Sequence, residues 1–180
     1  MGLGERIRQR RQQMEISLQE LANRTGLTAS FLSQVERDVT EPSISSLRRI
    51  AGALDVPVFF FLLDEGARSP VVRKSERRIL RLADTPAQWE LLSPSDPQSQ
   101  LEVVLTRLPP GVASGDEHQS HPGEEAFVVM QGVLEVTVAD ETYVLNEGDA
   151  IQFRASLPHR IKNGGKQELV VLAAITPPRF

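Results

Sequence analysis

The sequence predicts two domains, an all-α domain of five helices followed by an all-β barrel. Up to residue 64, apolar residues recur at intervals of three and four, as in helices buried on one side. After Pro70, apolar and polar residues alternate, as in strands buried on one face. The charge also changes, because residues 1–81 carry 14 Lys and Arg against 10 Asp and Glu, and residues 82–180 carry 6 against 14. We therefore predict a helical domain at 1–64, a basic linker at 65–81 and a β domain at 82–180.

Composition excludes several classes of protein. The 180 residues include no cysteine, which excludes disulfides and thiolate metal sites. The longest apolar run, Val56 to Leu63, is too short to cross a bilayer, so we expect a cytoplasmic protein without a membrane segment. The net charge is −4, but the basic first half predicts that only this half meets phosphate.

Each predicted helix has an apolar side, and the second, third and fourth also have a signal for their start or end. Ser17 with Glu20 three residues later, Thr28, and Pro42-Ser43 are typical of helix starts. Val56-Pro57 ends the fourth helix, and residues 58–63 are predicted to form a short fifth. The apolar sets, in chain order, are Leu3, Ile7 and Met14; Leu18, Leu21 and Ala22; Leu32 and Val35; and Ile44, Leu47, Ile50, Ala51 and Leu54.

The β domain is predicted from short alternating segments separated by turns. Leu134, Val136 and Val138 alternate with polar residues, and so do Ile151 and Phe153. Many short strands with regular turns are typical of a sandwich or barrel. The turns are predicted at Pro109-Pro110-Gly111, Ala139-Asp140-Glu141, Glu147-Gly148-Asp149 and Asn163-Gly164-Gly165.

A sharp turn between the second and third helices is the strongest signal in the first domain. Ala22 is small where two helices would cross, and Gly26 can take the positive φ of a tight turn. Arg11 and Glu36 are placed to form an ion pair that fixes the angle between the first and third helices. The full pattern is Leu18-x2-Leu21-Ala22-x3-Gly26-Leu27-x4-Leu32-x2-Val35-Glu36.

Over residues 3–63 this pattern resembles the XRE family of phage-repressor-like helix-turn-helix domains. The resemblance implies that the third helix enters the major groove of double-stranded DNA, an operator. Gln34 can then pair with adenine. Because the third helix contains no Lys, one copy would bind weakly, and we expect a homodimer on two half-sites about 34 Å apart. The expected base-reading residues are Thr28, Ala29, Ser30, Ser33, Gln34 and Arg37, and those expected near phosphate are Thr40, Ser43, Ser45 and Arg48.

Two motifs in the second domain resemble those of the cupin family of small β-barrels, or jelly rolls. They are His121-Pro122-Gly123-Glu124-Glu125-x6-Gly132, and Gly148-Asp149-x8-Pro158-His159-x3-Asn163. A helix-turn-helix followed by a cupin resembles a class of bacterial regulators that includes repressors of polyamine catabolism. The resemblance implies a domain that binds a small-molecule effector.

Glu125 is the residue whose chemistry can be argued directly. On a strand it shares an apolar face with Phe127 and Val129, where a carboxylate needs a partner. Three partners remain open: a metal shared with His121 and His159, a hydrogen bond to one of these imidazoles, or a cationic ligand. The predicted effector site is His121, Glu125, Phe127, Phe153 and His159.

The resemblance implies a divalent metal (Zn, Fe, Ni or Mn) at His121, Glu125 and His159. Metal-binding cupins have another His where this chain has Gln119, and His118 beside it would point the other way on a strand. A metal site and a metal-free effector pocket therefore both remain open.

Two functions follow. The first is a transcription regulator, a repressor without enzymatic activity, whose effector is a polyamine, an amino acid or a similar molecule. The alternative is a mononuclear metal oxygenase or epoxidase with an accessory helix-turn-helix.

Overall fold

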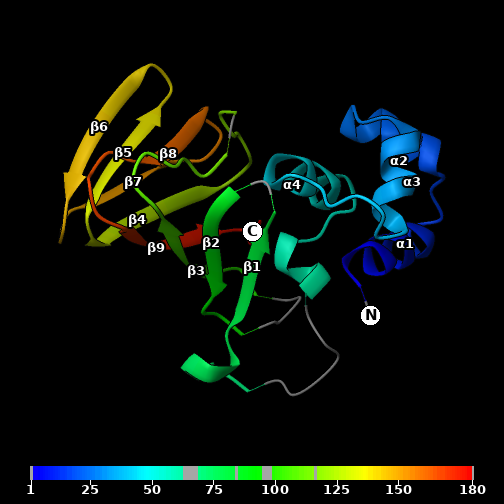
Figure 1. The fold of residues 1–180 in the computed structure, drawn as a ribbon, viewed down its shortest axis with the longest axis horizontal. Helices are drawn as coiled ribbons and strands as arrows, with labels where there is room; N and C mark the ends of the chain where they lie inside the picture. Colours follow the sequence, from blue (N-terminus) through cyan, green and yellow to red (C-terminus); the bar gives the residue numbers. More distant parts are fainter. Residues whose placement is uncertain (1, 63–68, 84, 95–98, 116, 180) are drawn as a thin grey trace. The chain divides into compact units, whose positions relative to one another are not determined.

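The computed structural model describes residues 2–62, 69–83, 85–94, 99–115 and 117–179 (Figure 1). The chain divides into two compact units, residues 1–64 with 179–180 and residues 65–178, which we describe separately. Leu63, the last residue of the predicted fifth helix, and residues 65–68 of the predicted linker lie outside the described residues. The expected order, helices first and strands second, is confirmed.

The first unit contains four α-helices in its described part: α1 (Leu3–Gln13), α2 (Leu18–Thr25), α3 (Ala29–Glu36) and α4 (Ile44–Ala53). The prediction of five α-helices is not confirmed, because the last segment is a 3-10 helix, η1 (Val58–Leu62). The Phe60 N–H donates to the Pro57 carbonyl three residues back, and a five-residue segment has little room for longer α-helical bonds. No helix in the described ranges is long and apolar enough to span a membrane.

Side-chain caps and one glycine set the helix boundaries. The hydroxyls of Ser17, Thr28 and Ser43 each accept a hydrogen bond from a backbone N–H three residues later, which confirms the predicted starts. Gly26 ends α2 with φ +64°. The core of the unit includes the fully buried Ile7, Leu21, Leu32, Leu47, Ile50 and Leu54.

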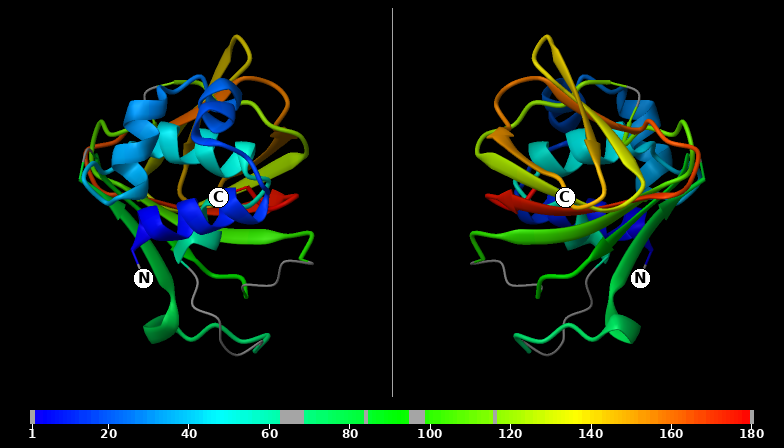
Figure 2. Two further views of the ribbon diagram at one scale, coloured as in Figure 1. Left: turned by 90° about the vertical axis from the view of Figure 1, so that its right-hand side faces the viewer. Right: turned by 90° about the vertical axis from the view of Figure 1, so that its left-hand side faces the viewer.

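The second unit forms two antiparallel sheets, so it is a β-sandwich. In the described residues the larger sheet has the order β1-β2-β3-β9-β4-β7, and the smaller has the order β6-β5-β8. Figures 1 and 2 show the yellow and orange strands of the smaller sheet as a layer apart from the green β3 and red β9. The bounds are β1 (Arg78–Leu82), β2 (Thr85–Leu91), β3 (Glu102–Leu108), β4 (Glu124–Gln131), β5 (Val133–Val138), β6 (Glu141–Asn146), β7 (Ala150–Arg154), β8 (His159–Asn163) and β9 (Leu169–Thr176).

The strand register decides which side chains enter the space between the sheets. Along β4, Glu125, Phe127 and Val129 are buried, whereas the residues between them are partly or fully exposed. Glu125 pairs with Phe153 on β7, and residues directly opposite on antiparallel strands share a face. The predicted carboxylate on an apolar inner face is therefore confirmed.

Candidate functional site

The outer surface of α3 carries the residues predicted to read DNA. Leu32 and Val35 are buried in the helical core, whereas Ser30 is exposed and Gln34 is partly exposed. Thr28 and Arg37, at the two ends of α3, are exposed as well. A helix with a buried apolar side and a small polar outer side can enter a groove without large side chains in the way.

An ion pair fixes α1 relative to α3. Nε of Arg11 donates to Oε1 of Glu36 at 2.6 Å, and Nη2 donates to Oε2 at 2.9 Å. The hydrogen bond that Arg11 donates to Glu36 raises the pKa of Arg11, although burial opposes this. The predicted pair is confirmed, and its bidentate geometry restricts the angle between the helices.

Two residues predicted to contact phosphate have partners within the protein. The Thr40 hydroxyl donates to Oε1 of Gln34 at 3.1 Å. The Ser43 hydroxyl donates to Oγ of Ser46 at 3.0 Å and accepts from the Ser46 N–H. The sequence prediction treated Thr40 and Gln34 as independent contacts, whereas the structure joins their side chains. Ser45 is partly exposed at the start of α4.

The second unit brings His121, Glu125 and His159 together. Nε2 of His121 lies 2.9 Å from Oε1 of Glu125, and Nε2 of His159 lies 3.7 Å from Oε2. The three side chains are 16%, 8% and 5% exposed, and one ligand atom from each lies within 4.8 Å of the others. His159, which is far from the other two in the sequence, thus joins His121 and Glu125 in one nearly buried polar cluster.

Strands from both sheets build this cluster. Glu125 belongs to β4 in the larger sheet, and His159 begins β8 in the smaller one. The segment before β4 is held by backbone hydrogen bonds, from the His121 N–H to the Ala155 carbonyl and in both directions between Gln119 and His159. The cluster therefore lies between the sheets, and its geometry depends on both.

Backbone carbonyls orient both imidazoles. Nδ1 of His159 lies 2.9 Å from the Leu157 carbonyl oxygen, and Nδ1 of His121 lies 3.1 Å from that of Pro122. A carbonyl oxygen only accepts, so each Nδ1 carries the hydrogen. In the neutral rings both Nε2 lone pairs then face the Glu125 carboxylate. A proton on His121 would let Nε2 donate to Oε1 of Glu125 at 2.9 Å, and with both rings neutral the three converging acceptors favour a bound cation, either a metal ion or a protonated group.

Aromatic rings extend the cluster along the inner face. The ring centre of Phe153 lies 5.1 Å from that of His159 and 5.4 Å from that of Phe127. The two imidazole centres are 5.3 Å apart. All five residues predicted for the effector site are therefore contiguous, with an apolar part beside a polar part.

The donor set fits a divalent metal ion. Ligand atoms about 2.1 Å from an ion and at right angles to one another are about 3.0 Å apart. The spacing of 2.9 Å between Nε2 of His121 and Oε1 of Glu125 matches this value, whereas Nε2 of His159, 3.7 Å from Oε2, would have to move closer to bind the same ion. Gln119 is paired opposite His159 and so shares its face, whereas His118 is exposed, as the sequence predicted.

Known families match both units. The helix-turn-helix family matches residues 7–61, and the cupin domain family matches residues 104–175. The HTH-type transcriptional regulator SutR of Escherichia coli (strain K12) is 32% identical over 177 residues, which cover 96% of this chain and 93% of that protein. This chain belongs to the helix-turn-helix transcriptional regulators with a C-terminal cupin domain.

Solved structures of other proteins have folds similar to that of this regulator. A crystal structure of an HTH_3 family transcriptional regulator from Vibrio cholerae has a TM-score of 0.80 and 23% identity, and the match covers 98% of this chain and 96% of that one. Hydroxypropylphosphonic acid epoxidase from S. wedmorenis has a TM-score of 0.50 and 20% identity, with 96% of each chain covered. At these identities the likeness concerns the fold alone.

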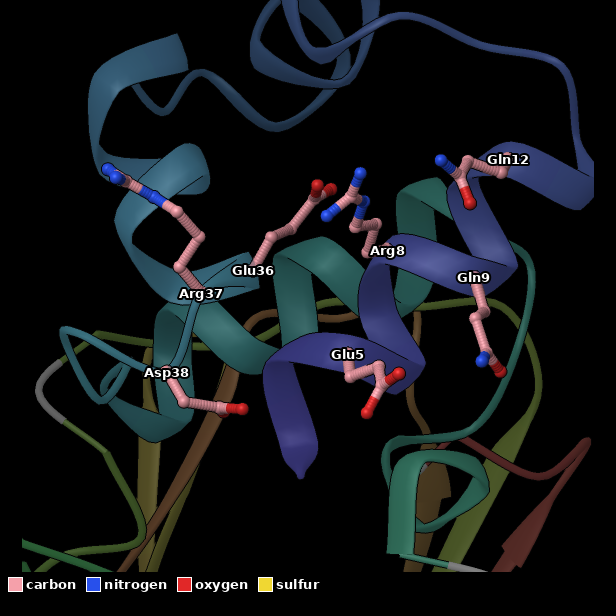
Figure 3. A pocket seen from close by; sticks show the side chains of 7 residues that line it. All are labelled: Glu5, Arg8, Gln9, Gln12, Glu36, Arg37 and Asp38. Atoms are coloured by element: carbon pink, nitrogen blue, oxygen red, sulfur yellow. The ribbon is translucent and has the colours of Figure 1, made fainter. Parts of the chain in front are cut away.

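The helical unit of the regulator also has a polar hollow of about 420 Å³. Figure 3 shows side chains from α1 and from the end of α3 around it, with acidic, basic and amide groups among them. Of the predicted site residues only Arg37 lines it, and it includes none of His121, Glu125 and His159. The lining residues are Glu5, Arg8, Gln9, Gln12, Glu36, Arg37 and Asp38.

Sequence reasoning missed the carbonyls of Pro122 and Leu157, which orient the imidazoles of the regulator. Backbone groups leave no residue-type signal. The only hint was a proline beside each histidine, Pro122 after His121 and Pro158 before His159, because proline restricts the local backbone.

Proposed function

We propose that this regulator is a sequence-specific repressor whose affinity for its operator is controlled by a small molecule bound in the cupin unit. The observation that carries the proposal is the nearly buried cluster of His121, Glu125 and His159, in a chain whose other unit is a helix-turn-helix. Burying three polar groups is unfavourable for folding alone, which supports a binding role for them.

On the DNA side, the proposal assigns base contacts to Ser30, Ser33 and Gln34, beside Ala29, with Thr28 and Arg37 at the two ends of α3. Thr40, Ser43, Ser45 and Arg48 would lie near the phosphates. We propose a cytoplasmic homodimer on two half-sites about 34 Å apart, because one α3 offers few charges for phosphate.

On the cupin side, the converging acceptors favour a cationic occupant. His121, Glu125 and His159 would hold a divalent ion (Zn, Fe, Ni or Mn), which would act there as a Lewis acid for a donor atom of the effector. A protonated amine, as in a polyamine or an amino acid, would satisfy the same three acceptors directly. Phe127 and Phe153 would contact the apolar part of either effector.

Regulation requires that the effector bind two states of the protein with different affinities. The cluster is built from both sheets, so an occupant would change the spacing or the rigidity between them. We propose that this change reaches the DNA-binding units through the dimer.

The DNA half of the proposal is tested with the full-length protein and a duplex from upstream of its own gene. We expect specific binding that weakens steeply as the salt concentration rises. Gln34→Ala should weaken it by about 5- to 150-fold, which corresponds to about 1–3 kcal/mol for a bidentate base contact. Gln13→Ala, an exposed glutamine at the end of α1, is the matched control and should bind normally. Equal binding by both variants would contradict the assignment of Gln34.

The cupin half is tested by adding Zn²⁺, Mn²⁺ or Ni²⁺, and separately putrescine, to wild type and His159→Ala. We expect at least one probe to raise the melting temperature of the wild type and to change its operator affinity. His159→Ala should keep operator binding and lose both responses. A wild type that responds to none of these probes would contradict a cationic occupant.

An iron oxygenase is the second candidate, because two histidines and one carboxylate also form the facial triad of such enzymes. This alternative predicts stoichiometric iron in the purified protein and no specific DNA binding at any salt concentration. The two assays above therefore separate it from the repressor.

A further inference from the structure

The chain turns sharply at the end of α3. Asp38 has φ +53°, and its N–H donates to the Val35 carbonyl at 2.9 Å. The next N–H, that of Val39, donates to the Gln34 carbonyl at 2.9 Å. These two bonds around a residue with positive φ define a Schellman motif. In this motif the N–H of the residue after the turn, here Val39, bonds to the carbonyl of the residue three before the helix cap, here Gln34. Val39 and Gln34 are therefore neighbours in the fold, joined through their backbones.

Val39 is the most exposed large apolar residue in the described part of the chain. It is 68% exposed. A single exposed valine is ordinary on a protein surface. This one differs by its position, because Gln34 is beside it, Arg37 precedes it by two residues, and Thr40 follows it. The apolar side chain of Val39 thus lies among polar residues that the proposed function assigns to DNA contacts.

The first helix holds this turn in place. Oδ1 of Asp38 accepts a hydrogen bond from the Gly4 N–H at 2.8 Å, which compensates for the unusual backbone angle. A Cβ at Gly4 would lie 2.0 Å from the Val35 carbonyl oxygen, so only glycine allows this approach. Figure 3 shows Asp38 just after the end of α3, across from the start of α1. Val39 is therefore presented by an anchored turn.

Thr40 fixes the amide of Gln34. Its hydroxyl donates to Oε1 at 3.1 Å, which limits rotation of the carboxamide. The second lone pair of Oε1 and the two hydrogens of Nε2 remain for a base. Those groups match the N6 and N7 edge of adenine. Thr40 is thus a positioning residue for Gln34.

We propose that Val39 reads a thymine in the operator. Its methyl groups would contact the 5-methyl group of a thymine next to the base pair read by Gln34, with Thr40 orienting that glutamine. Thymine is the only base that presents a methyl group in the major groove, so this apolar contact carries sequence information. The inference rests on the proposed role of α3 as the reading helix, and it predicts an adenine beside a thymine in each half-site.

The test begins with the full-length protein and a random-sequence DNA library, from which bound duplexes are selected. Each thymine of the selected sequence is then replaced, one at a time, by deoxyuridine, which lacks only the methyl group. At one position per half-site, this replacement should weaken wild-type binding about fourfold, the value expected for one buried methyl group. In Val39→Ala the same replacement should have no further effect.

Val144→Ala is the matched control, because Val144 is 65% exposed and belongs to β6 in the other unit. It should respond to deoxyuridine as the wild type does. Thr40→Val should reduce the preference for adenine at the neighbouring position more than it reduces binding to unrelated DNA. A loss of all DNA binding in equal measure would instead mean that Thr40 acts only on phosphate or on folding.

Two negative results are distinguishable. If no sequence is enriched and no salt-sensitive binding is found, the proposed function fails and this inference falls with it. If a specific sequence is enriched, but no thymine shows a methyl effect that depends on Val39, only the inference is overturned.

Discussion

The two units bury carboxylates in opposite ways. In the helical unit, the Glu36 side chain is 4% exposed and receives two hydrogen bonds from one guanidinium. In the cupin unit, the Glu125 side chain is 8% exposed and faces two imidazoles whose other nitrogens already donate to carbonyls. The first carboxylate is neutralised within the fold, whereas our proposal assigns the second to a cation from outside. Burial alone therefore does not distinguish a carboxylate that stabilises the fold from one that binds a ligand. The charge of the groups around the carboxylate is the property on which we base this distinction.

The largest expected effect is that of Glu36→Ala. Removal of this carboxylate leaves Arg11 nearly buried without its counter-ion, which should destabilise the helical unit by about 3–5 kcal/mol. Urea denaturation followed by circular dichroism measures this. Glu20→Ala is the control, because the ion pair between Glu20 and Arg24 is exposed and should contribute at most about 1 kcal/mol.

A double variant addresses the case in which Glu36→Ala does not fold. Replacing both partners, as in Arg11→Met with Glu36→Leu, removes both charges and should restore most of the stability. If the double variant is as unstable as Glu36→Ala, the pair does more than neutralise charge, and the comparison with Glu125 loses its basis.

Glu90 is a structural carboxylate within the cupin unit, and Glu90→Gln should reduce stability less than Glu36→Ala does. Burial raises the pKa of Glu90, but hydrogen bonds from Arg107 and Arg77 outweigh burial and lower it. A lowered pKa in the folded state means that the carboxylate stabilises the fold above its ordinary pKa, about 4.3, and that this stabilisation is lost as the pH falls further. Glu90→Gln should therefore be less stable than wild type at pH 7, and the difference should shrink in acid. A constant difference across this range would contradict the role of the charge.

The smallest effect on folding is expected for Glu125→Gln. Its amide can donate to Nε2 of His121, which relieves the convergence of acceptors, so stability at pH 7 should change by less than about 1 kcal/mol. Affinity for Mn²⁺ or Ni²⁺, measured by calorimetry, should nevertheless fall by at least about a hundredfold, because an amide is a weaker ligand than a carboxylate. If Glu125→Gln loses as much stability as Glu90→Gln, the cluster is structural.

Features with a local chemical cause were predictable from the sequence. Ser17, Thr28 and Ser43 were identified as caps because their side chains compete for backbone N–H groups at short range. Gly26 was identified because a tight turn requires positive φ. Alternation along β4 gave the inner face of Glu125 without any knowledge of its neighbours.

Features set by tertiary contacts or by unusual residues were not predictable. A 3-10 helix such as η1 has hydrogen bonds between residues three apart, and an α-helix has them between residues four apart. The spacing of apolar residues does not distinguish these two forms. The turn at Asp38 was missed because glycine is the usual residue there, and the Asp is held by Gly4, 34 positions away. The bond between Thr40 and Gln34 exists only because this turn folds the chain back.

The placement of the cluster between two layers has a mechanical consequence. Glu125 and His159 are anchored in different sheets, so an ion that draws their ligand atoms closer than 3.7 Å would tie the two layers together. Such a tie would stiffen the sandwich. Amide hydrogen exchange along β4 and β8 should therefore slow when the site fills, even where the backbone coordinates of the two states coincide.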